Sequence, residues 1–237
     1  MKLSAPIFRL KRQAKLLARQ ETIPLHEAQD RIARDEGFQR WSHLAAHHGD
    51  IPLAQEVLDQ FDPGDLVLLA GKRYQGKTVL AYDLIAEALK RRRSSRLFSL
   101  DENGPDIEHR LEAAGVDLAA SSAYFSYDTS DEISAAYIVE RCCKVNSGAL
   151  IVMDYLQMLD QQRSKPVLAD QVDALKVFAE QSQSTIVLLS QVDRSFDRSQ
   201  RTFPDAEDIR LPNPIDLTQF AKTCIIHHGE VKVGVVA

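Results

Sequence analysis

Residues 66–78 read LVLLAGKRYQGKT, an apolar run of strand length followed by the complete motif G-x-x-x-x-G-K-[ST]. A helical pattern of apolar residues continues from residue 77 to 92. A loop between a buried strand and a helix can wrap its backbone N–H groups around phosphate, and the helix N-terminus adds positive potential. The sequence therefore predicts a phosphate-binding loop that consists of Gly71, Lys72, Arg73, Tyr74, Gln75, Gly76, Lys77 and Thr78.

Two residues of this loop carry chemistry of their own. Lys77 is expected to reach the β- and γ-phosphates of a nucleotide, and the hydroxyl of Thr78 is expected to ligate Mg²⁺. ATP and Mg²⁺ are therefore the expected cofactors. A chance glycine-rich turn is the alternative, but the strand, the helix, the lysine and the threonine all stand where the motif needs them.

A second acid near the metal is expected at the end of the apolar run 150–154, LIVMD. Ligands of open α/β sheets bind at the carboxyl edge of the strands, and a strand that ends in a carboxylate places that group there. Asp154 is therefore predicted to complete the metal shell, in the role of a Walker B acid. A surface acid that merely follows a strand would have the same local sequence.

Nucleotide hydrolysis also needs a group that orients the attacking water. Asp101 and Glu102 directly follow the apolar run 97–100, and Gln191 follows the run 185–190. The two acids are candidates for the base, and Gln191 is a candidate sensor of the γ-phosphate. Adjacent acids are also common in loops, and the sequence does not decide which of the two reaches the water.

Strand-length apolar runs alternate with helical patterns along the rest of the chain. The expected strands are 66–70, 97–100, 123–127, 150–153, 185–189 and 223–227, and the expected helices are 77–92, 106–114, 131–145 and 166–182. Continuous apolar strands separated by helices predict a mostly parallel sheet covered by helices on both faces, which is the α/β class. Residues 192–214 are polar and contain three prolines, so they are expected to form a long mobile loop. A short hairpin through Gly229 is expected near the end.

The first 50 residues have a different pattern. Helical spacing covers residues 5–20 and 24–37, a short turn should contain Trp41 and Leu44, and no stretch alternates like a strand. The aromatic pair Phe38 and Trp41 is expected to form core. We therefore expect a small all-helical module at 1–50, a linker helix at 51–60 and an α/β domain at 61–237.

Charge is unevenly distributed in this chain of 237 residues and net charge −5. Residues 1–20 carry six basic side chains and no acid, whereas acids outnumber bases in residues 51–237. A basic arm on an acidic body points to a polyanionic partner. One basic helix face consists of Lys11, Arg12, Lys15 and Arg19. This face is expected to contact single-stranded DNA, and the alternative is that it is simply solvated.

Several classes of protein are excluded. The three cysteines show no C-x-x-C spacing, which argues against a disulfide framework and against zinc. No apolar run approaches the roughly 18–20 residues that span a bilayer, and the first 25 residues lack the apolar stretch of a secretory signal. A cytoplasmic protein without membrane contact is expected.

Five separated strings, in the right order, carry a resemblance to a known family. They are Gly64-Asp65-Leu66, Phe98-Ser99-Leu100, Asp128-Thr129, IVMDYLQM at 151–158, and Leu189-Ser190-Gln191 with Arg194-Ser195. Over about residues 61–228 the sequence resembles the RecA-type ATPase domain of DnaB-type replicative helicases. The resemblance implies a RecA-like core that binds ATP and Mg²⁺ and that usually works as a ring, a homo-oligomer, on single-stranded DNA.

The sequence departs from that family in ways that keep two functions open. The family's water-polarising Glu corresponds here to Asp101, with Glu102 next to it, and no Arg that would reach a neighbouring subunit follows Lys232. The first function is an ATP-hydrolysing, DnaB-helicase-like protein that acts on or near DNA. The second is a regulatory or adaptor ATPase with weak or no hydrolysis and a protein partner. A small-molecule kinase would need a lid with clustered arginines, which the sequence lacks.

Overall fold

The computed structural model describes residues 7–41, 44, 54–73, 75–143, 145–160, 165–199, 201–211, 213 and 215–236. Tyr74 and the side chains of Lys11 and Arg12 lie outside the described residues. The chain divides into two compact units, Met1–Leu53 with His228–Val231, and Ala54–His227 with Lys232–Ala237.

The first unit contains helices α1 (Ile7–Glu21) and α2 (Leu25–Asp35). Pro24 occupies the N-cap position of α2, where its fixed φ suits the start of a helix. A small core contains Leu10, Ala33, Phe38 and Leu44, with Trp41 packed against it. The two aromatic residues therefore serve as core, as their spacing indicated.

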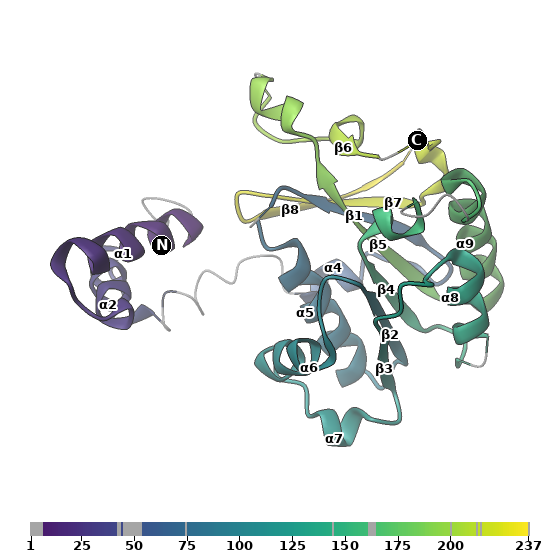
Figure 1. The fold of residues 1–237 in the computed structure, drawn as a ribbon, viewed down its shortest axis with the longest axis horizontal. Helices are drawn as coiled ribbons and strands as arrows, with labels where there is room; N and C mark the ends of the chain where they lie inside the picture. The colour runs from purple at the N-terminus through teal and green to yellow at the C-terminus, as the bar shows by residue number, and fades with distance from the viewer. Residues whose placement is uncertain are drawn as a thin grey trace. The chain divides into compact units, whose positions relative to one another are not determined.

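The second unit is built on one sheet (Figure 1). Its strands are β1 (Leu66–Gly71), β2 (Ser95–Ser99), β3 (Phe125–Asp128), β4 (Leu150–Asp154), β5 (Thr185–Val192), β6 (Ile209–Arg210), β7 (Lys222–His227) and β8 (Glu230–Val235). The strand order is β3-β2-β4-β5-β1-β7-β8, and β6 pairs with β5. Strand β1 pairs in parallel with β5 and β7, β2 pairs in parallel with β3 and β4, and β4 pairs in parallel with β5, whereas β6 is antiparallel to β5. All six residues of β1 are buried, because neighbouring strands and helices cover this central strand on every side.

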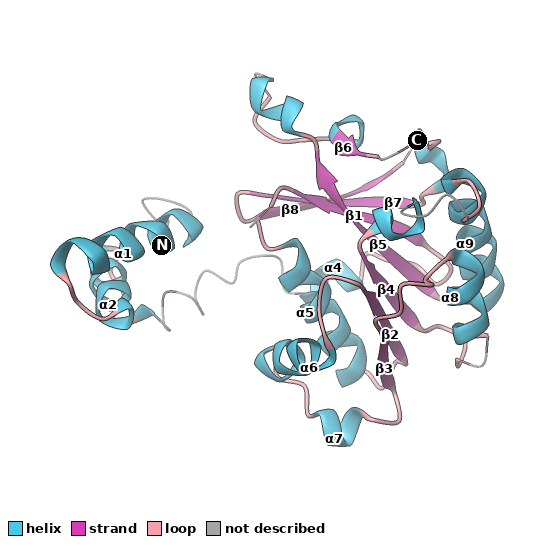
Figure 2. Cartoon of the chain, in the orientation of Figure 1, coloured by secondary structure: helices cyan, strands magenta, loops and turns pink. Residues whose placement is uncertain are grey.

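Helices cover both faces of the sheet, with α5 and α6 on one side and α8 and α9 on the other (Figure 2). Every second residue of the central strands, such as Leu68 and Ile151, joins one core cluster with Leu168 and Val172 of α9. The helices are α4 (Ala54–Leu58), α5 (Lys77–Lys90), α6 (Gly104–Ala113), α7 (Leu118–Ser121), α8 (Ala135–Cys142) and α9 (Leu168–Ser182). The predicted α/β class with a mostly parallel, doubly covered sheet is confirmed.

The expectation of a long loop at 192–214 was wrong in part. The segment contains the 3₁₀ helices η2 (Arg194–Arg198) and η3 (Ala206–Asp208) and the strand β6. Side chains of Asp193 and Asp205 cap these helices, and the Ser190 hydroxyl donates to the carbonyl of Arg210 at 2.9 Å. Elements this short have no periodicity that a sequence pattern can reveal. Two further 3₁₀ helices, η1 (Leu156–Asp160) and η4 (Leu217–Gln219), and helix α7 were also missed.

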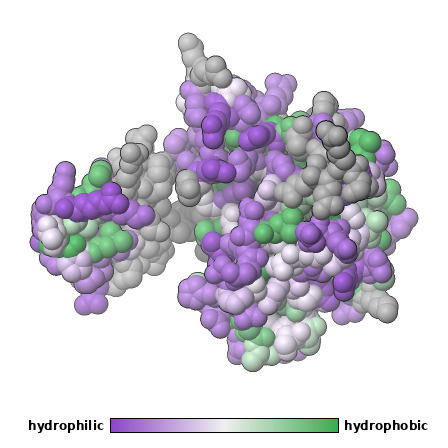
Figure 3. Space-filling view, viewed as in Figure 1, coloured by the Kyte–Doolittle hydropathy of each residue, from purple (hydrophilic) through white to green (hydrophobic). Residues whose placement is uncertain are grey.

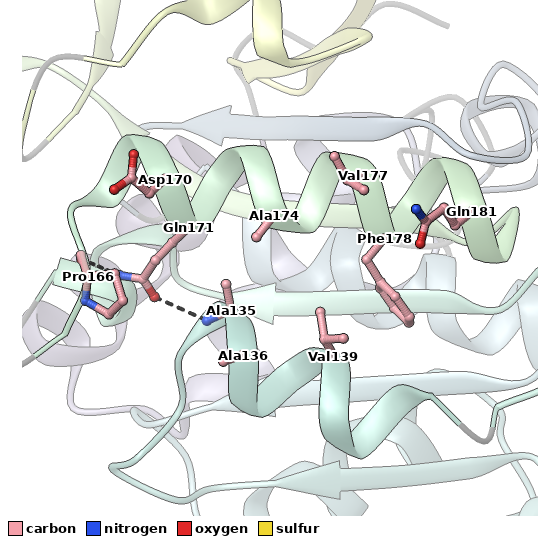
Figure 4. Close-up of a pocket in the computed structure, with 10 residues that line it drawn as sticks. All are labelled: Ala135, Ala136, Val139, Pro166, Asp170, Gln171, Ala174, Val177, Phe178 and Gln181. Atoms are coloured by element: carbon pink, nitrogen blue, oxygen red, sulfur yellow. Dashed lines mark hydrogen bonds between the residues drawn. The ribbon is translucent and has the colours of Figure 1, made fainter.

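An apolar groove of about 520 Å³ lies between α8 and α9 (Figure 4). Val139, Val177 and Phe178 line it, and Gln171 crosses one end to accept a hydrogen bond from the Ala135 amide at 3.1 Å. Elsewhere the visible surface mixes hydrophilic and hydrophobic residues (Figure 3). Among the described residues, no helix has both the length and the apolar character that crossing a membrane requires.

Candidate nucleotide site

The phosphate-binding loop begins where the buried strand β1 ends. Gly71 pairs with Ile226 of β7 on one side and with Gln191 of β5 on the other. A Cβ atom at Gly71 would lie 2.5 Å from Cγ2 of Ile226 and 3.0 Å from its carbonyl oxygen. Because Cβ atoms do not approach other atoms so closely, this end of the strand requires glycine.

The second motif glycine starts the helix. Gly76 has φ 96°, a left-handed conformation that L side chains rarely adopt, and it is the N-cap of α5. Helix α5 therefore begins a few residues after the carboxyl end of β1. Free N–H groups at a helix N-terminus suit an anion such as phosphate.

The structure brings two expected metal residues together. Thr78, on the first turn of α5, donates from Oγ1 to Oδ2 of Asp154 at 3.1 Å. Asp154 is the last residue of β4, so 76 positions in the sequence separate the partners. Burial raises the pKa of the Asp154 carboxyl above its ordinary value, while Lys77 and the Thr78 hydrogen bond act in the opposite direction.

Both candidate bases lie near Asp154. Ser99, the last residue of β2, pairs with Asp154 in the sheet, and Asp101 and Glu102 follow directly. The negative charges of Glu102 and Asp101 also raise the pKa of Asp154, which places three carboxyl groups in one region. Asp101 is exposed, whereas the Glu102 side chain is only 12% exposed.

The structure separates the two acids by their contacts. The Tyr82 hydroxyl donates to Oε2 of Glu102, and Nε of Arg110 lies 2.5 Å from Oε1 of Glu102. Sequence reasoning missed Tyr82 and Arg110. A signal for Tyr82 existed, because it stands four residues after Thr78 and therefore shares one face of α5.

Residues of other elements contact the phosphate-binding loop at its start. Gln191 is half-buried and stands opposite Gly71 in the sheet, beside the start of the loop. The Lys72 ammonium forms an ion pair with Asp197 of η2 and lies 4.7 Å from the ring centre of Phe196. Arg73 is exposed. The loop that follows β5 is thus tied to the phosphate-binding loop.

The donors present suit Mg²⁺ bound together with a nucleotide. The hydroxyl of Thr78 and the carboxylate of Asp154 are the hard oxygen ligands that Mg²⁺ prefers, and this ion usually completes its shell with phosphate oxygens and water. Across the described residues, no group of three or more His, Cys, Asp or Glu side chains could hold a metal ion alone.

The basic residues expected to contact DNA lie in the other unit. Lys15 and Arg19 are exposed on α1.

The sheet order, the covered faces and the loop after the central strand define a RecA-like P-loop fold of the ATPase type. A family model described as DnaB-like helicase C terminal domain matches residues 116–226, a segment that starts after the phosphate-binding loop. The chain resembles the RecA-like ATPase domain of DnaB-type helicases, as its sequence strings indicated.

Two curated relatives are replicative DNA helicases. DnaB of Leifsonia xyli subsp. xyli (strain CTCB07) is 24% identical over 89% of this chain and 53% of its own length. DnaB of Geobacillus stearothermophilus is 26% identical over 70% of this chain and 44% of its own length. The chain thus spans about half the length of the curated relatives it matches.

Solved structures share the fold. One of them, described as an ATPase domain, has a TM-score of 0.56 at 18% identity, and the match covers 79% of this chain and 80% of that domain. A DnaB-like replicative helicase, solved in a study of its interactions with primase, has a TM-score of 0.57 at 14% identity, with 92% and 65% covered. A KaiC-like protein of Pyrococcus horikoshii OT3 has a TM-score of 0.52 at 15% identity, with 70% and 72% covered.

Proposed function

We propose that this protein binds ATP with Mg²⁺ at the loop 71–78 and hydrolyses it, as a DnaB-helicase-like ATPase that acts on or near DNA. The observation that carries the proposal is the pairing of Thr78 with Asp154 at the mouth of a complete phosphate-binding loop. The likeness to DnaB-type ATPase domains supports the same activity.

Each residue has a distinct part in this proposal. Backbone N–H groups of the loop and the ammonium of Lys77 hold the phosphates, and Thr78 and Asp154 hold Mg²⁺. When bound, the metal neutralises the charge that develops on the phosphate oxygens. An acid after β2 accepts the proton of the attacking water, and Gln191 contacts the γ-phosphate from the end of β5.

The proposed partner is single-stranded DNA, reached through the basic face of α1, and the proposed working state is a homo-oligomer. The relatives' description as replicative helicases and the basic first 20 residues support this. The regulatory or adaptor function is not favoured by the comparisons. It would show itself as nucleotide binding without turnover.

Titration calorimetry with ATP, with and without Mg²⁺, tests the site, and Lys77→Ala is the matched control because it removes one charge at the loop. ATP turnover with and without single-stranded DNA then tests the activity, and size-exclusion chromatography in both nucleotide states tests assembly. Unchanged ATP affinity in a folded Lys77→Ala protein would show that the site is wrong. Tight binding without turnover would favour the adaptor.

A further inference from the structure

We propose that Ser99, the last residue of β2, is a positioning residue for the metal site. In the protein with Mg²⁺ and ATP bound, its hydroxyl donates a hydrogen bond to the Asp154 carboxylate and fixes the orientation in which that group holds Mg²⁺. This proposal rests on the proposed function, because it adds a residue to the same site.

The Ser99 hydroxyl is buried without a hydrogen-bond partner. The residue is only 1% exposed, and within the described part of the chain no polar atom is placed to bond with the hydroxyl oxygen. Burial of a polar group costs free energy unless the group is paired, so most buried polar groups in folded proteins have partners. An unpaired hydroxyl at the carboxyl edge of the sheet therefore needs an explanation.

Two other buried serines of the sheet are paired. The Ser190 hydroxyl, near the end of β5, donates to the carbonyl of Arg210 at 2.9 Å. The Ser95 hydroxyl, at the start of β2, donates to the carbonyl of Arg93 at 3.4 Å. The unpaired hydroxyl of Ser99 is thus not a general property of serines in these strands.

The sheet places Ser99 directly beside Asp154. Strands β2 and β4 are parallel, and Ser99 and Asp154 are register partners at their carboxyl ends. Side chains of such partners point to the same face of the sheet, and neighbouring strands lie about 4.8 Å apart. The Asp154 carboxylate accepts a hydrogen bond from Thr78 of α5, so the shared face is the one that α5 covers.

A hydrogen bond can close the gap between the two side chains. The hydroxyl oxygen of Ser99 is one bond from its Cβ atom, and the carboxylate oxygens of Asp154 are two bonds from theirs. Between neighbouring strands, rotation of the serine about χ1 can bring its oxygen within reach of the carboxylate. An ionised carboxylate has several acceptor sites, so capacity remains beside the hydrogen bond from Thr78.

A second contact on Asp154 matters because of what Thr78 is expected to do. Groups that hold a metal are oriented by hydrogen bonds from their surroundings. Thr78 supplies one such bond to Asp154, but the same hydroxyl is expected to ligate Mg²⁺. Ser99 belongs to a different element, so it orients Asp154 independently of Thr78. The hydroxyl that is unpaired in the nucleotide-free protein thus finds its acceptor in the bound state.

Titration calorimetry of the full chain with ATP, with and without Mg²⁺, tests the proposal in Ser99→Ala. The gain in ATP affinity that Mg²⁺ provides should fall about tenfold, the loss expected for one hydrogen bond to a charged group, and affinity without Mg²⁺ should stay within about twofold of wild type. Ser95→Ala is the matched control, because it removes a buried hydroxyl from the same face of the same strand, and it should keep the full gain. An unchanged gain in Ser99→Ala, or an equal loss of affinity without Mg²⁺, would overturn the proposal.

Thermal unfolding without any ligand separates positioning from a structural role. Because the Ser99 hydroxyl is unpaired in the nucleotide-free protein, Ser99→Ala should keep or raise the Tm, whereas Ser95→Ala should lower it. A fall in Tm of about 2 °C or more in Ser99→Ala would mean that the hydroxyl is already bonded in the free protein, and it would contradict the proposed role.

A double-mutant cycle shows whether Ser99 acts through Asp154. In an Asp154→Ala background the acceptor is gone, so adding Ser99→Ala should weaken the binding of ATP with Mg²⁺ no further. Additive losses would mean that Ser99 acts on another group, against the proposal. A wild-type ATP affinity that does not depend on Mg²⁺ would contradict the proposed function and this proposal together. That result differs from Mg²⁺-dependent binding that Ser99→Ala leaves unchanged, which contradicts the role of Ser99 alone.

Discussion

Thr78→Val and Asp154→Asn should change the stability of the nucleotide-free protein in opposite directions, although both changes fall on one hydrogen bond. Valine keeps the shape of threonine but leaves the raised-pKa carboxylate of Asp154 without the hydroxyl that donates to it at 3.1 Å. A hydrogen bond to a charged group contributes about 1.5–3 kcal/mol. At about 2–4 °C per kcal/mol for a domain of this size, Tm should fall by about 3–12 °C.

Asp154→Asn should instead raise Tm. Burial and the negative charges of Glu102 and Asp101 oppose the ionised form of Asp154, and an asparagine oxygen still accepts from Thr78. A carboxyl whose pKa is raised in the folded state stabilises the fold at low pH and loses that contribution as the pH rises through the raised value. The gain in Asp154→Asn should therefore appear as the pH rises out of the acidic range and then stay constant.

Thermal unfolding followed by circular dichroism, with and without Mg²⁺ and ATP, measures both effects. Mg²⁺ and ATP at about 100 times the Kd should stabilise the wild type by about 2.7 kcal/mol. Both variants should lose the part of that gain that depends on Mg²⁺. Thr78→Ser, which keeps the hydroxyl, is the control and should behave as the wild type. Equal destabilisation of the nucleotide-free protein by Thr78→Val and Asp154→Asn would refute the reasoning.

Three further predictions concern other parts of the chain. Lys77→Ala should weaken ATP binding about 100-fold in calorimetry, the loss expected for a charge-assisted contact of about 2.7 kcal/mol, and should leave the nucleotide-free Tm unchanged; a large fall in that Tm would point to a structural role. Gly71→Ala should cost about 1–3 kcal/mol in urea unfolding, because its Cβ overlaps the neighbouring strand β7, and an unchanged midpoint would contradict the close packing there. Single-stranded DNA binding should show a slope of about −2 in log K against log[salt] for three phosphate contacts. Changing Lys11, Lys15 and Arg19 together to Gln should flatten that slope and leave ATP binding intact. A wild-type affinity that does not depend on salt would contradict the DNA hypothesis.

The sequence determined the fold class and the place of the phosphate-binding loop because those signals are local. A continuous apolar strand, a glycine-rich turn and a helix with a Lys-Thr start lie within 25 residues, and each is readable from residue type and spacing. Asp154 could be named for the same reason, since its strand ends in the acid. The covered parallel sheet followed from the repeated alternation of apolar strands with helices.

Tertiary structure decided which of these groups meet and which are already engaged. The sequence could not choose between Asp101 and Glu102, because the partners of Glu102 come from α5 and α6 and are brought to it only by packing. The position of Gln191 opposite Gly71 depends on β5 lying beside β1, and strand order is not encoded in any local pattern. Neighbours in space that are distant in sequence arise from burial of the common core, so the division of roles within this site belongs to the tertiary structure.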